Sequence, residues 1–210
     1  MYLLIIGNGA MGKRVEKIAR EDELFSKIDV VDPLDKASWP EGKADLLIDF
    51  SHPKAIKDIY EYCREKGGNI PVIIGTTGQT EEEETVLALL DKICPVMRKT
   101  NFSRGVEAMN EVAKTVANLL YGSDVNVEEI HHTKKKDAPS GTAKTLCDLV
   151  GIPYEKAVSI RMGTIAGQHS VFFALEDEIL EIKHTAFSKD IFARGALEKG
   201  KDMLKAKKDN

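Results

Sequence analysis

The sequence is poor in cysteine, has no long apolar segment and carries no excess of positive charge, and each absence excludes a class of protein. Only three of its 210 residues are cysteines, and they are far apart and form no C-x-x-C pair. This excludes a disulfide framework and favours free thiols in a reducing compartment. No apolar run approaches the roughly 20 residues that span a bilayer, so we expect no membrane segment. A net charge of −4 argues against a protein dedicated to nucleic acid.

The remaining composition is typical of a globular protein, with 42% hydrophobic and 30% charged residues. The length suits one large domain or two small ones with a substantial core. The apolar run from Met1 to Ile6 is too short for a signal peptide and has no basic start. We therefore expect a cytoplasmic protein.

Short apolar strands alternate with helical segments in the N-terminal half. The apolar runs are residues 2–6, 28–31, 44–51, 70–74 and 94–97. Thr80 and Glu83 form a capping box, which predicts the start of one of the helices that connect the strands. This alternation predicts an α/β fold with a Rossmann-type, doubly wound parallel sheet.

The first strand leads directly into a G-x-G-x-x-G motif, Gly7-Asn8-Gly9-Ala10-Met11-Gly12, and a helical segment follows. In a Rossmann unit the first glycine allows the tight turn, the second lets the backbone approach a pyrophosphate, and the third lets helix pack on strand. The second strand ends at Asp32, twenty residues after Gly12, where such a unit places the carboxylate that binds the adenosine ribose. An ordinary surface aspartate before Pro33 is the alternative reading of Asp32.

Three further polar turns follow the later strands. They are Asp49-Phe50-Ser51, Gly75-Thr76-Thr77-Gly78 and Lys99-Thr100-Asn101-Phe102. Ligands of parallel sheets bind beyond the carboxyl ends of the strands, where all three turns are expected. Any one of them alone is ordinary turn chemistry, but together with the glycine motif they favour a dinucleotide crevice.

The pattern changes near Ser103 from alternation to mostly strand. A helix is predicted from Ser103 to Tyr121, followed by strands at 124–128, 158–162, 169–175 and 179–184. We expect an open mixed sheet with one helix after Ser140. A last helix begins near Asp190, and the lysine-rich residues 205–210 are expected to be a solvated, fraying end.

The segment from Glu128 to Ala143 concentrates the groups that can do chemistry, with two histidines and a run of three lysines. His131 and His132 are adjacent on a predicted strand, so their side chains should point to opposite faces. Because they cannot easily share an ion, and no zinc-like spacing lies nearby, we predict no metal site. Structural histidines and solvated lysines are the alternative readings of these residues.

A helix is predicted to begin at the end of this segment, with Ser140 or Thr142 as its N-cap. The first turn of a helix presents unpaired N–H groups and a positive dipole end, which favour an anion. A dinucleotide crevice in one domain and a cationic, proton-bearing loop in the other predict hydride transfer to a small acidic molecule.

The segment Glu128 to Ala143 resembles the signature of the 4-hydroxy-tetrahydrodipicolinate reductase (dihydrodipicolinate reductase) family, Glu-x-x-His-His-x-x-Lys-x-Asp-Ala-Pro-Ser-Gly-Thr-Ala. The resemblance extends over nearly the whole chain, through the glycine motif and the polar turns. It continues in Arg161-x-Gly163-x-x-x-Gly167-x-His169, His184-x-Ala186-x-Ser188 and Phe192-Ala193-x-Gly195-Ala196.

The resemblance implies a dinucleotide-binding Rossmann domain at 1–102 and 185–210, with an inserted α+β substrate and oligomerisation domain at 103–184. It implies NAD(P)H-dependent reduction of 4-hydroxy-tetrahydrodipicolinate to tetrahydrodipicolinate, in lysine and diaminopimelate biosynthesis. A homotetramer assembled through the sheets of the second domain is also implied.

Roles for individual residues follow from matching the family's motif positions. His131 and Lys135 would be catalytic, as acid/base and proton donor. Substrate would be bound by His132, Ser140, Gly141, Thr142 and Thr77. The nucleotide would be bound by Gly7, Asn8, Gly9, Ala10, Met11, Gly12, Asp32, Gly75, Thr76, Thr77, Lys99, Thr100, Asn101 and Phe102.

The glycine turn departs from the pattern of many relatives, which have a longer turn with an arginine. Asp32 would repel the 2′-phosphate of NADPH, which leaves Lys13, Arg14 or Lys36 as its possible partners. We therefore predict that the cofactor is NADH, with NADPH as a weaker alternative.

Two competing functions remain open at this point. An amino-acid dehydrogenase with the same fold would use the His-His-Lys loop for another dicarboxylate. A non-enzymatic dinucleotide sensor should lack the proton-transfer residues, and His131, Lys135 and the Ser-Gly-Thr turn are all present.

Overall fold

The computed structural model describes residues 1–33, 35 and 38–208, and the chain divides into two compact units. Unit 1 comprises Met1–Phe102 and Phe192–Asn210, and unit 2 comprises Ser103–Ile191. The sequence prediction returned the chain to the first domain at residue 185. The return comes later because the last strand of unit 2 extends to Ala186 and a short turn follows it.

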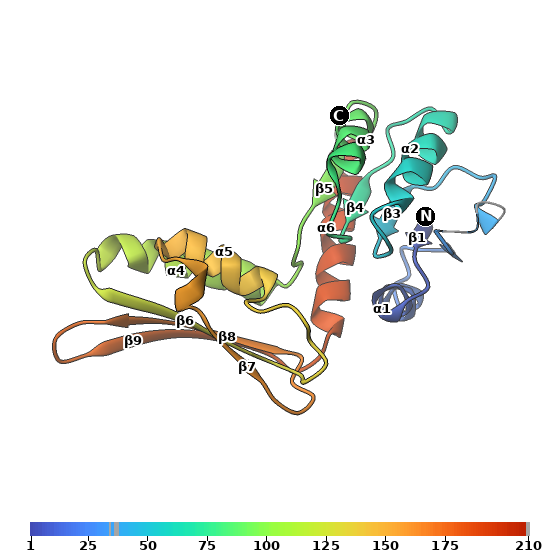
Figure 1. Ribbon diagram of the computed structural model, residues 1–210. Helices are drawn as coiled ribbons and strands as arrows, with labels where there is room; N and C mark the ends of the chain where they lie inside the picture. Colours follow the sequence, from blue (N-terminus) through green and yellow to red (C-terminus); the bar gives the residue numbers. More distant parts are fainter. Residues whose placement is uncertain (34, 36–37, 209–210) are drawn as a thin grey trace. The chain divides into compact units, whose positions relative to one another are not determined.

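Unit 1 contains a five-stranded parallel sheet in the order β2-β1-β3-β4-β5 (Figure 1). Its strands are β1 (Tyr2–Ile6), β2 (Lys27–Val31), β3 (Leu46–Asp49), β4 (Val72–Ile74) and β5 (Val96–Arg98). Its helices are α1 (Ala10–Arg20), α2 (Ala55–Glu65), α3 (Glu81–Asp91) and α6 (Asp190–Lys208), whose first two residues belong to unit 2. The predicted doubly wound Rossmann-type sheet is thereby confirmed.

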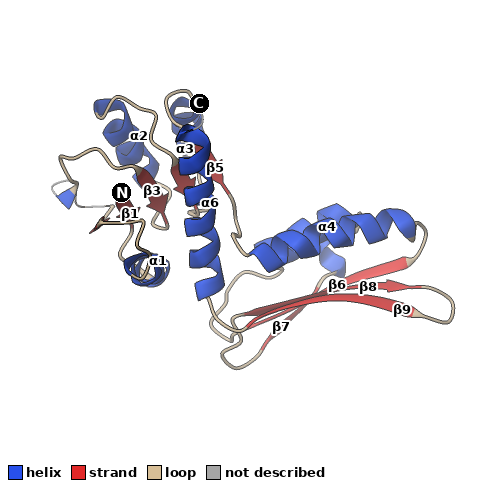
Figure 2. Cartoon of the chain, turned by 180° about the vertical axis from the view of Figure 1, so that it is seen from behind, coloured by secondary structure: helices blue, strands red, loops and turns tan. Residues whose placement is uncertain are grey.

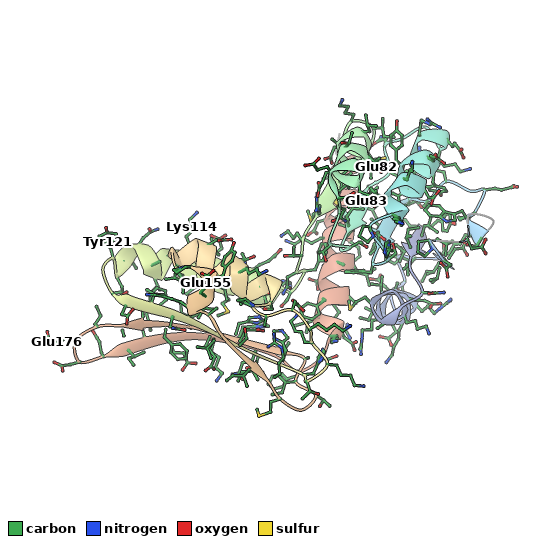
Figure 3. All side chains as sticks on the ribbon, viewed as in Figure 1. Glu82, Glu83, Lys114, Tyr121, Glu155 and Glu176 are labelled. Carbon is green, nitrogen blue, oxygen red and sulfur yellow. The ribbon has the colours of Figure 1, made fainter. Side chains whose placement is uncertain are left out.

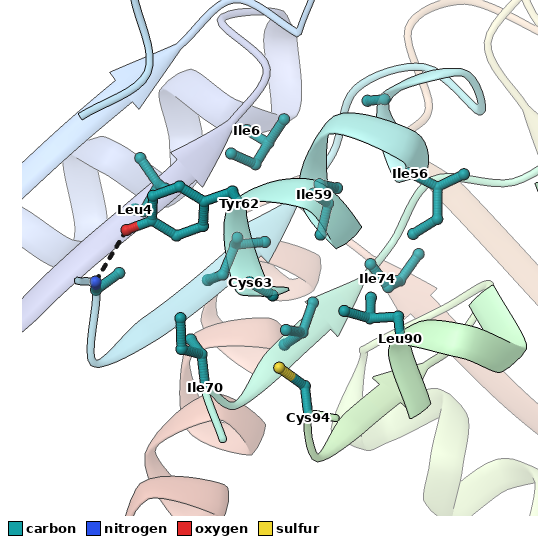
Figure 4. Close-up of a cluster of buried hydrophobic side chains, with 14 of the residues drawn as sticks. Leu4, Ile6, Ile56, Ile59, Tyr62, Cys63, Ile70, Ile74, Leu90 and Cys94 are labelled. Carbon is teal, nitrogen blue, oxygen red and sulfur yellow. Dashed lines mark hydrogen bonds between the residues drawn. The ribbon is translucent and has the colours of Figure 1, made fainter. Parts of the chain in front are cut away.

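Residues of β1 point alternately to two apolar clusters, one on each face of the sheet. Leu4 and Ile6 face the cluster formed with α2 and α3 (Figure 4), and Leu3 and Ile5 face the cluster formed with α1 and α6. Because both faces are covered, the inner strands β1 and β4 are continuously apolar, as buried parallel strands usually are.

The start of α3 is fixed by a capping box, as the sequence predicts. The backbone N–H and the hydroxyl of Thr80 both donate to the Glu83 carboxylate, at 2.7 Å. Glu82 and Glu83 project from the first turn of α3 (Figure 3), where carboxylates are favoured by the helix dipole.

Unit 2 is an α+β unit with a four-stranded mixed sheet in the order β7-β6-β8-β9. The strands are β6 (Asp124–His131), β7 (Val158–Arg161), β8 (Gly167–Ala174) and β9 (Ile179–Ala186). The helices are α4 (Arg104–Leu119), α5 (Gly141–Val150) and the short 3₁₀ turn η2 (Tyr154–Lys156). Both α4 and α5 cover the same face of the sheet, and within the described residues of unit 2 no helix covers the other (Figures 1 and 2).

The lysine-rich residues 205–208 continue α6, where a solvated, fraying end was predicted; Lys205 and Ala206 are solvent-exposed as predicted, but the backbone is helical. In this part of α6, Leu204 is buried and the Lys207 ammonium donates to the Asn69 carbonyl at 2.6 Å. Packing of an apolar face against the sheet outweighs the low apolar content of the last turns. Among the described helices, none is long and apolar enough to cross a bilayer.

Candidate functional site

The glycine motif forms the tight turn between β1 and α1 that its spacing predicts. Gly7 has a positive φ of 104°, and a Cβ at Gly12 would lie 1.8 Å from the carbonyl oxygen of Gly7. Any side chain at either position would therefore be excluded. A Cβ at Gly9, in contrast, would meet no atom within 4 Å, so open space lies beside the backbone at the second glycine.

The N-terminus of α1 has the features of an anion site. Its N-cap, Gly9, provides no side-chain capping bond, and the first turn contains no acidic residue. The N–H groups of Ala10 and Met11 belong to this first turn, which begins next to the open space at Gly9. These features fit the pyrophosphate of a dinucleotide.

Asp32 follows β2 at the same edge of the sheet, and Asn8 donates to its carboxylate at 3.5 Å. The carboxylate therefore lies next to the glycine turn, as the ribose-binding role requires. Of the possible phosphate partners, Lys13 is exposed and Arg14 half-buried on α1, whereas Lys36 lies outside the described residues.

The turns after β3 and β4 are joined by a buried carboxyl group. Burial raises the pKa of Asp49 to about 6, against the opposing effect of hydrogen bonds from Ser51 and Thr76. The Ser51 N–H also donates to the Thr76 hydroxyl at 2.8 Å. Thr76 is thus buried in a structural role, while Thr77 next to it is exposed.

Residues 99–102 follow β5 at the same edge. The Phe102 side chain is buried and packs edge-to-face on Phe50, with 5.9 Å between ring centroids. The Lys99 N–H donates to the Ile74 carbonyl at 3.2 Å, and the side chain of Thr100 is exposed. The Phe102 side chain is part of the hydrophobic core. The predicted nucleotide-binding roles stay predictions for Lys99, Thr100, Asn101 and Phe102.

In unit 2, the candidate chemistry gathers on the helix-covered face of the sheet. Glu129 and His131 are two residues apart on β6, so their side chains share this face, and the His131 Nδ1 contacts the Glu129 carboxylate. His169 on β8 packs its ring edge-to-face on His131, with centroids 5.1 Å apart. Glu129 is fully buried, and both histidines are nearly so.

The three groups have clear protonation preferences. Burial alone would raise the pKa of Glu129, but the Ser159 hydroxyl, the Arg161 guanidinium and His131 hold that pKa below its usual range. Burial lowers the pKa of His131, although Glu129 opposes the shift. Burial and the neighbouring His131 lower the pKa of His169 to about 3, so His169 is neutral near pH 7.

Arg161 on β7 connects this cluster to the lysine loop. Its Nη2 donates to the Glu129 carboxylate at 2.8 Å and to the Asp137 carbonyl at 2.5 Å, and its Nε donates to the Lys135 carbonyl at 3.3 Å. The guanidinium therefore fixes the backbone of the loop against the buried carboxylate of β6.

Only the middle lysine of the run lies inward. Lys135 is half-buried and donates to both carboxylate oxygens of Asp137 at 2.8 Å, whereas Lys134 and Lys136 are exposed. Lys135 is thus the lysine of the run best placed to act on a ligand.

Ser140 is the N-cap of α5, one of the two predicted candidates. Its hydroxyl oxygen accepts from the Ala143 N–H at 3.2 Å and lies 3.1 Å from the His169 Nε2. A Cβ at Gly141 would meet nothing within 4 Å, so there is open space beside the first residue of the helix. No acidic side chain lies in the first turn of α5, so this N-terminus can accept a carboxylate.

His132 lies just beyond β6 and is separate from the buried cluster. Its Nε2 is 3.4 Å from the Lys189 ammonium, and its N–H donates to the Ile165 carbonyl. Thr142 lies in the first turn of α5 and is half-buried. The substrate-binding roles of His132, Thr142 and Thr77 stay predictions.

The structure brings together three possible metal ligands that the sequence spacing did not reveal. Ligand atoms of Glu129, His131 and His169 all lie within 4.8 Å of one another. However, the Arg161 guanidinium already donates to Glu129, and its charge opposes a second cation there. The prediction of no metal site stays a prediction.

Glu129, Asp137 and Lys189 carried no assigned role in the sequence analysis, and Arg161 and His169 only marked a resemblance. The signal for Glu129 was present in β6, where Val125, Val127, Glu129 and His131 alternate with residues of the other face. Arg161 and His169 lie on other strands, and only sheet pairing brings them to His131.

The chain matches one family along almost its entire length. Sequence profiles of the dihydrodipicolinate reductase N-terminus and C-terminus match residues 1–102 and 105–209. The 4-hydroxy-tetrahydrodipicolinate reductases of Caldanaerobacter subterraneus subsp. tengcongensis and Staphylococcus epidermidis are 35% and 36% identical to it. These alignments cover 96% and 97% of this chain and 92% and 95% of the relatives.

Solved structures share the fold. A dipicolinate-bound dihydrodipicolinate reductase from Paenisporosarcina sp. TG-14 gives a TM-score of 0.75 at 21% identity, over 98% of this chain and 95% of that one. An aspartate dehydrogenase from Thermotoga maritima gives a TM-score of 0.53 at 17% identity, over 97% and 96%. The latter likeness shows that an amino-acid dehydrogenase can have a similar architecture.

Proposed function

Because the chain belongs to the dihydrodipicolinate reductase family of NAD(P)H-dependent oxidoreductases, we propose that it reduces 4-hydroxy-tetrahydrodipicolinate, or its dehydrated form, to tetrahydrodipicolinate. The observation that carries this proposal lies within unit 2. One connected set of contacts joins His131, the Lys135 loop and the N-terminus of α5. A proton donor, a cation and an anion site therefore occur together.

The N-terminus of α5 would bind one carboxylate of the substrate. Open space at Gly141 lets an anion approach the first N–H groups of the helix. If the His169 Nε2–H donates to Ser140, the hydroxyl hydrogen of Ser140 is left to bind the carboxylate. The Lys189 ammonium beside His132 is a further cation for a dicarboxylate.

Lys135 and His131 would handle the proton. Reduction of the conjugated imine adds a hydride and a proton, and the reduced nicotinamide of the cofactor supplies the hydride. The Lys135 ammonium would stabilise the negative charge that develops and donate the proton. His131 would act as the acid/base group beside it, in an environment that keeps its pKa low.

Unit 1 would bind the nucleotide, with its pyrophosphate at the N-terminus of α1 and its adenosine ribose at Asp32. We propose that NADH is preferred, because the Asp32 carboxylate beside the glycine turn would repel a 2′-phosphate.

A coupled assay with the upstream synthase and each reduced nucleotide tests the reaction and the preference together. We expect oxidation of NADH that depends on the synthase product, with kcat/KM at least about tenfold higher than for NADPH, equivalent to about 1.4 kcal/mol. A large preference for NADPH would contradict the role given to Asp32. Oxidation of NADH with simple keto acids and ammonia, but not with the synthase product, would favour an amino-acid dehydrogenase. Nucleotide binding without turnover would favour a sensor.

We further propose that the chain forms a homotetramer through the uncovered face of the unit 2 sheet, defined here by Ile130, Val158, Ile160, Phe172 and Ile179. The register of the strands assigns these side chains to the face opposite Val127 and Val171, which are buried under the helices. Val158 and Ile179 are exposed and the other three half-buried. The same register places Asn126, Glu128, Glu181 and Lys183 on this face, so exposed apolar side chains lie among charged and polar ones, as they do in protein–protein interfaces.

Replacing Phe172 by glutamate should convert the tetramer to smaller species, because a carboxylate would be buried without a partner. Sedimentation velocity would measure this, with Leu119→Glu on the exposed surface of α4 as the control. A wild-type monomer, or a Phe172→Glu protein of unchanged size, would refute the interface.

A further inference from the structure

We propose that Glu129 positions His131 for catalysis and that Arg161 extends this positioning to the Lys135 loop. The inference rests on the proposed function, because it assigns roles within that reaction. All three side chains lie on one face of one sheet, since Arg161 is paired in register with His131 and Glu129 is two residues before it.

Glu129 determines which nitrogen of His131 carries the proton. The carboxylate contacts His131 Nδ1, and the Arg161 guanidinium, 2.8 Å from its other oxygen, stabilises its ionised form. An ionised carboxylate only accepts hydrogen bonds, so Nδ1 must be the protonated nitrogen of the neutral ring. The lone pair is therefore on Nε2.

The two ring nitrogens of His131 have different surroundings. The Nδ1 atom is fully buried against Glu129. Gly167 of β8 approaches Nε2 so closely that a Cβ there would lie 3.0 Å from it, so a side chain at this position would crowd that nitrogen. Nε2 is thus the nitrogen that can exchange a proton with a ligand.

Arg161 couples this arrangement to the loop that contains Lys135. Besides Glu129, the guanidinium donates to the backbone carbonyls of Lys135, Asp137 and Ile160. A planar guanidinium makes these bonds in a fixed geometry that a lysine cannot reproduce. The two residues proposed to move protons are therefore held relative to each other by one buried ion pair.

A positioning role for Glu129 is better supported than a metal site made of Glu129, His131 and His169. A metal would need the carboxylate that Arg161 already neutralises, and it would need His131 Nδ1 deprotonated. The two arrangements give different ring protonation, which makes them distinguishable by experiment.

The first test uses nitrogen-15 NMR of the unmodified, histidine-labelled protein, with His131 assigned through His131→Asn. In the wild-type protein we expect the His131 tautomer with the proton on Nδ1. In the Glu129→Gln variant, His131 should titrate at a lower pH, because the carboxylate that favours the imidazolium is gone. An Nε2–H tautomer in the wild type, or a stoichiometric shift of His131 and His169 signals by Zn²⁺, would overturn the proposal.

The second test is kinetic. Glu129→Gln should lower kcat by about 10²-fold or more, as when the carboxylate that orients a catalytic histidine is replaced, while KM for the dicarboxylate changes little. Glu129→Asp should recover part of the loss. Glu128→Gln makes the same change on the opposite face of β6 and is the matched control, with its subunit assembly measured alongside.

Arg161→Lys should also lower kcat, because the loop that contains Lys135 is no longer held against Glu129, while KM for NADH is unchanged. Kinetics of Glu129→Gln equal to those of Glu128→Gln would overturn the positioning role. The NMR measurement needs no substrate, so a wild-type protein that fails to reduce the proposed substrate refutes the proposed function without affecting the tautomer result.

Discussion

Replacing Lys135 by alanine should lower kcat by about 10²- to 10⁴-fold and leave the dissociation constant of NADH unchanged. The reason is that the variant loses the half-buried ammonium proposed to donate the proton, whereas the glycine turn of unit 1 is untouched. Steady-state kinetics and NADH titration by fluorescence would measure the two quantities separately.

The lysine run supplies its own controls for this experiment. Lys134→Ala and Lys136→Ala remove the same charge from exposed positions in the same loop. They should retain kcat within about threefold, since exposed charges contribute little locally. His131→Ala should resemble Lys135→Ala. If all three lysine variants lose activity equally, the loop acts through its overall charge and Lys135 has no special role.

Replacing Gly195 by alanine should destabilise unit 1 by about 3 kcal/mol or more, because a Cβ there would lie 1.7 Å from the Phe102 carbonyl oxygen. Backbone atoms cannot move aside as a side chain can, so α6 would have to shift from the sheet. For a chain of this size, that loss corresponds to a Tm lower by about 6 to 12 °C, measurable by calorimetry.

Gly200 in the same helix provides a graded comparison. A Cβ at Gly200 would lie 2.6 Å from the end of the Leu46 side chain, which can rotate, and alanine is favoured over glycine in a helix by about 1 kcal/mol. Gly200→Ala should therefore lower the free energy of unfolding clearly less than Gly195→Ala does. Equal Tm values for the two variants would show that the close approach to Phe102 does not limit stability.

The parts of the fold predicted from sequence are those whose signals are local. The glycine turn, the capping box at Thr80 and the N-cap at Ser140 each depend on residues a few positions apart. The ends of strands were predicted less accurately. For example, β5 begins at Val96, two residues after the predicted start at Cys94. A buried apolar run does not mark where ladder hydrogen bonds begin.

The candidate site was predictable only where one segment supplies it. His131, Lys135 and Ser140 come from a single stretch of chain, and the structure joins them through contacts within unit 2. The pairing of β6 with β7 and β8 adds Arg161 and His169, and no local pattern specifies that register. Sequence motifs alone therefore could not predict the ion pair between Glu129 and Arg161.

The position of α6 in unit 1 has a consequence for how the chain is made. The five strands of the unit 1 sheet and helices α1 to α3 are synthesised first, yet the apolar side chains of Leu3, Ile5 and Ile48 are covered in part by α6, which is synthesised only after all the strands of unit 2. Unit 2, with a core of its own, is complete earlier. A nascent chain thus carries a half-covered sheet until α6 has been synthesised, which is the interval when a chaperone has most to protect.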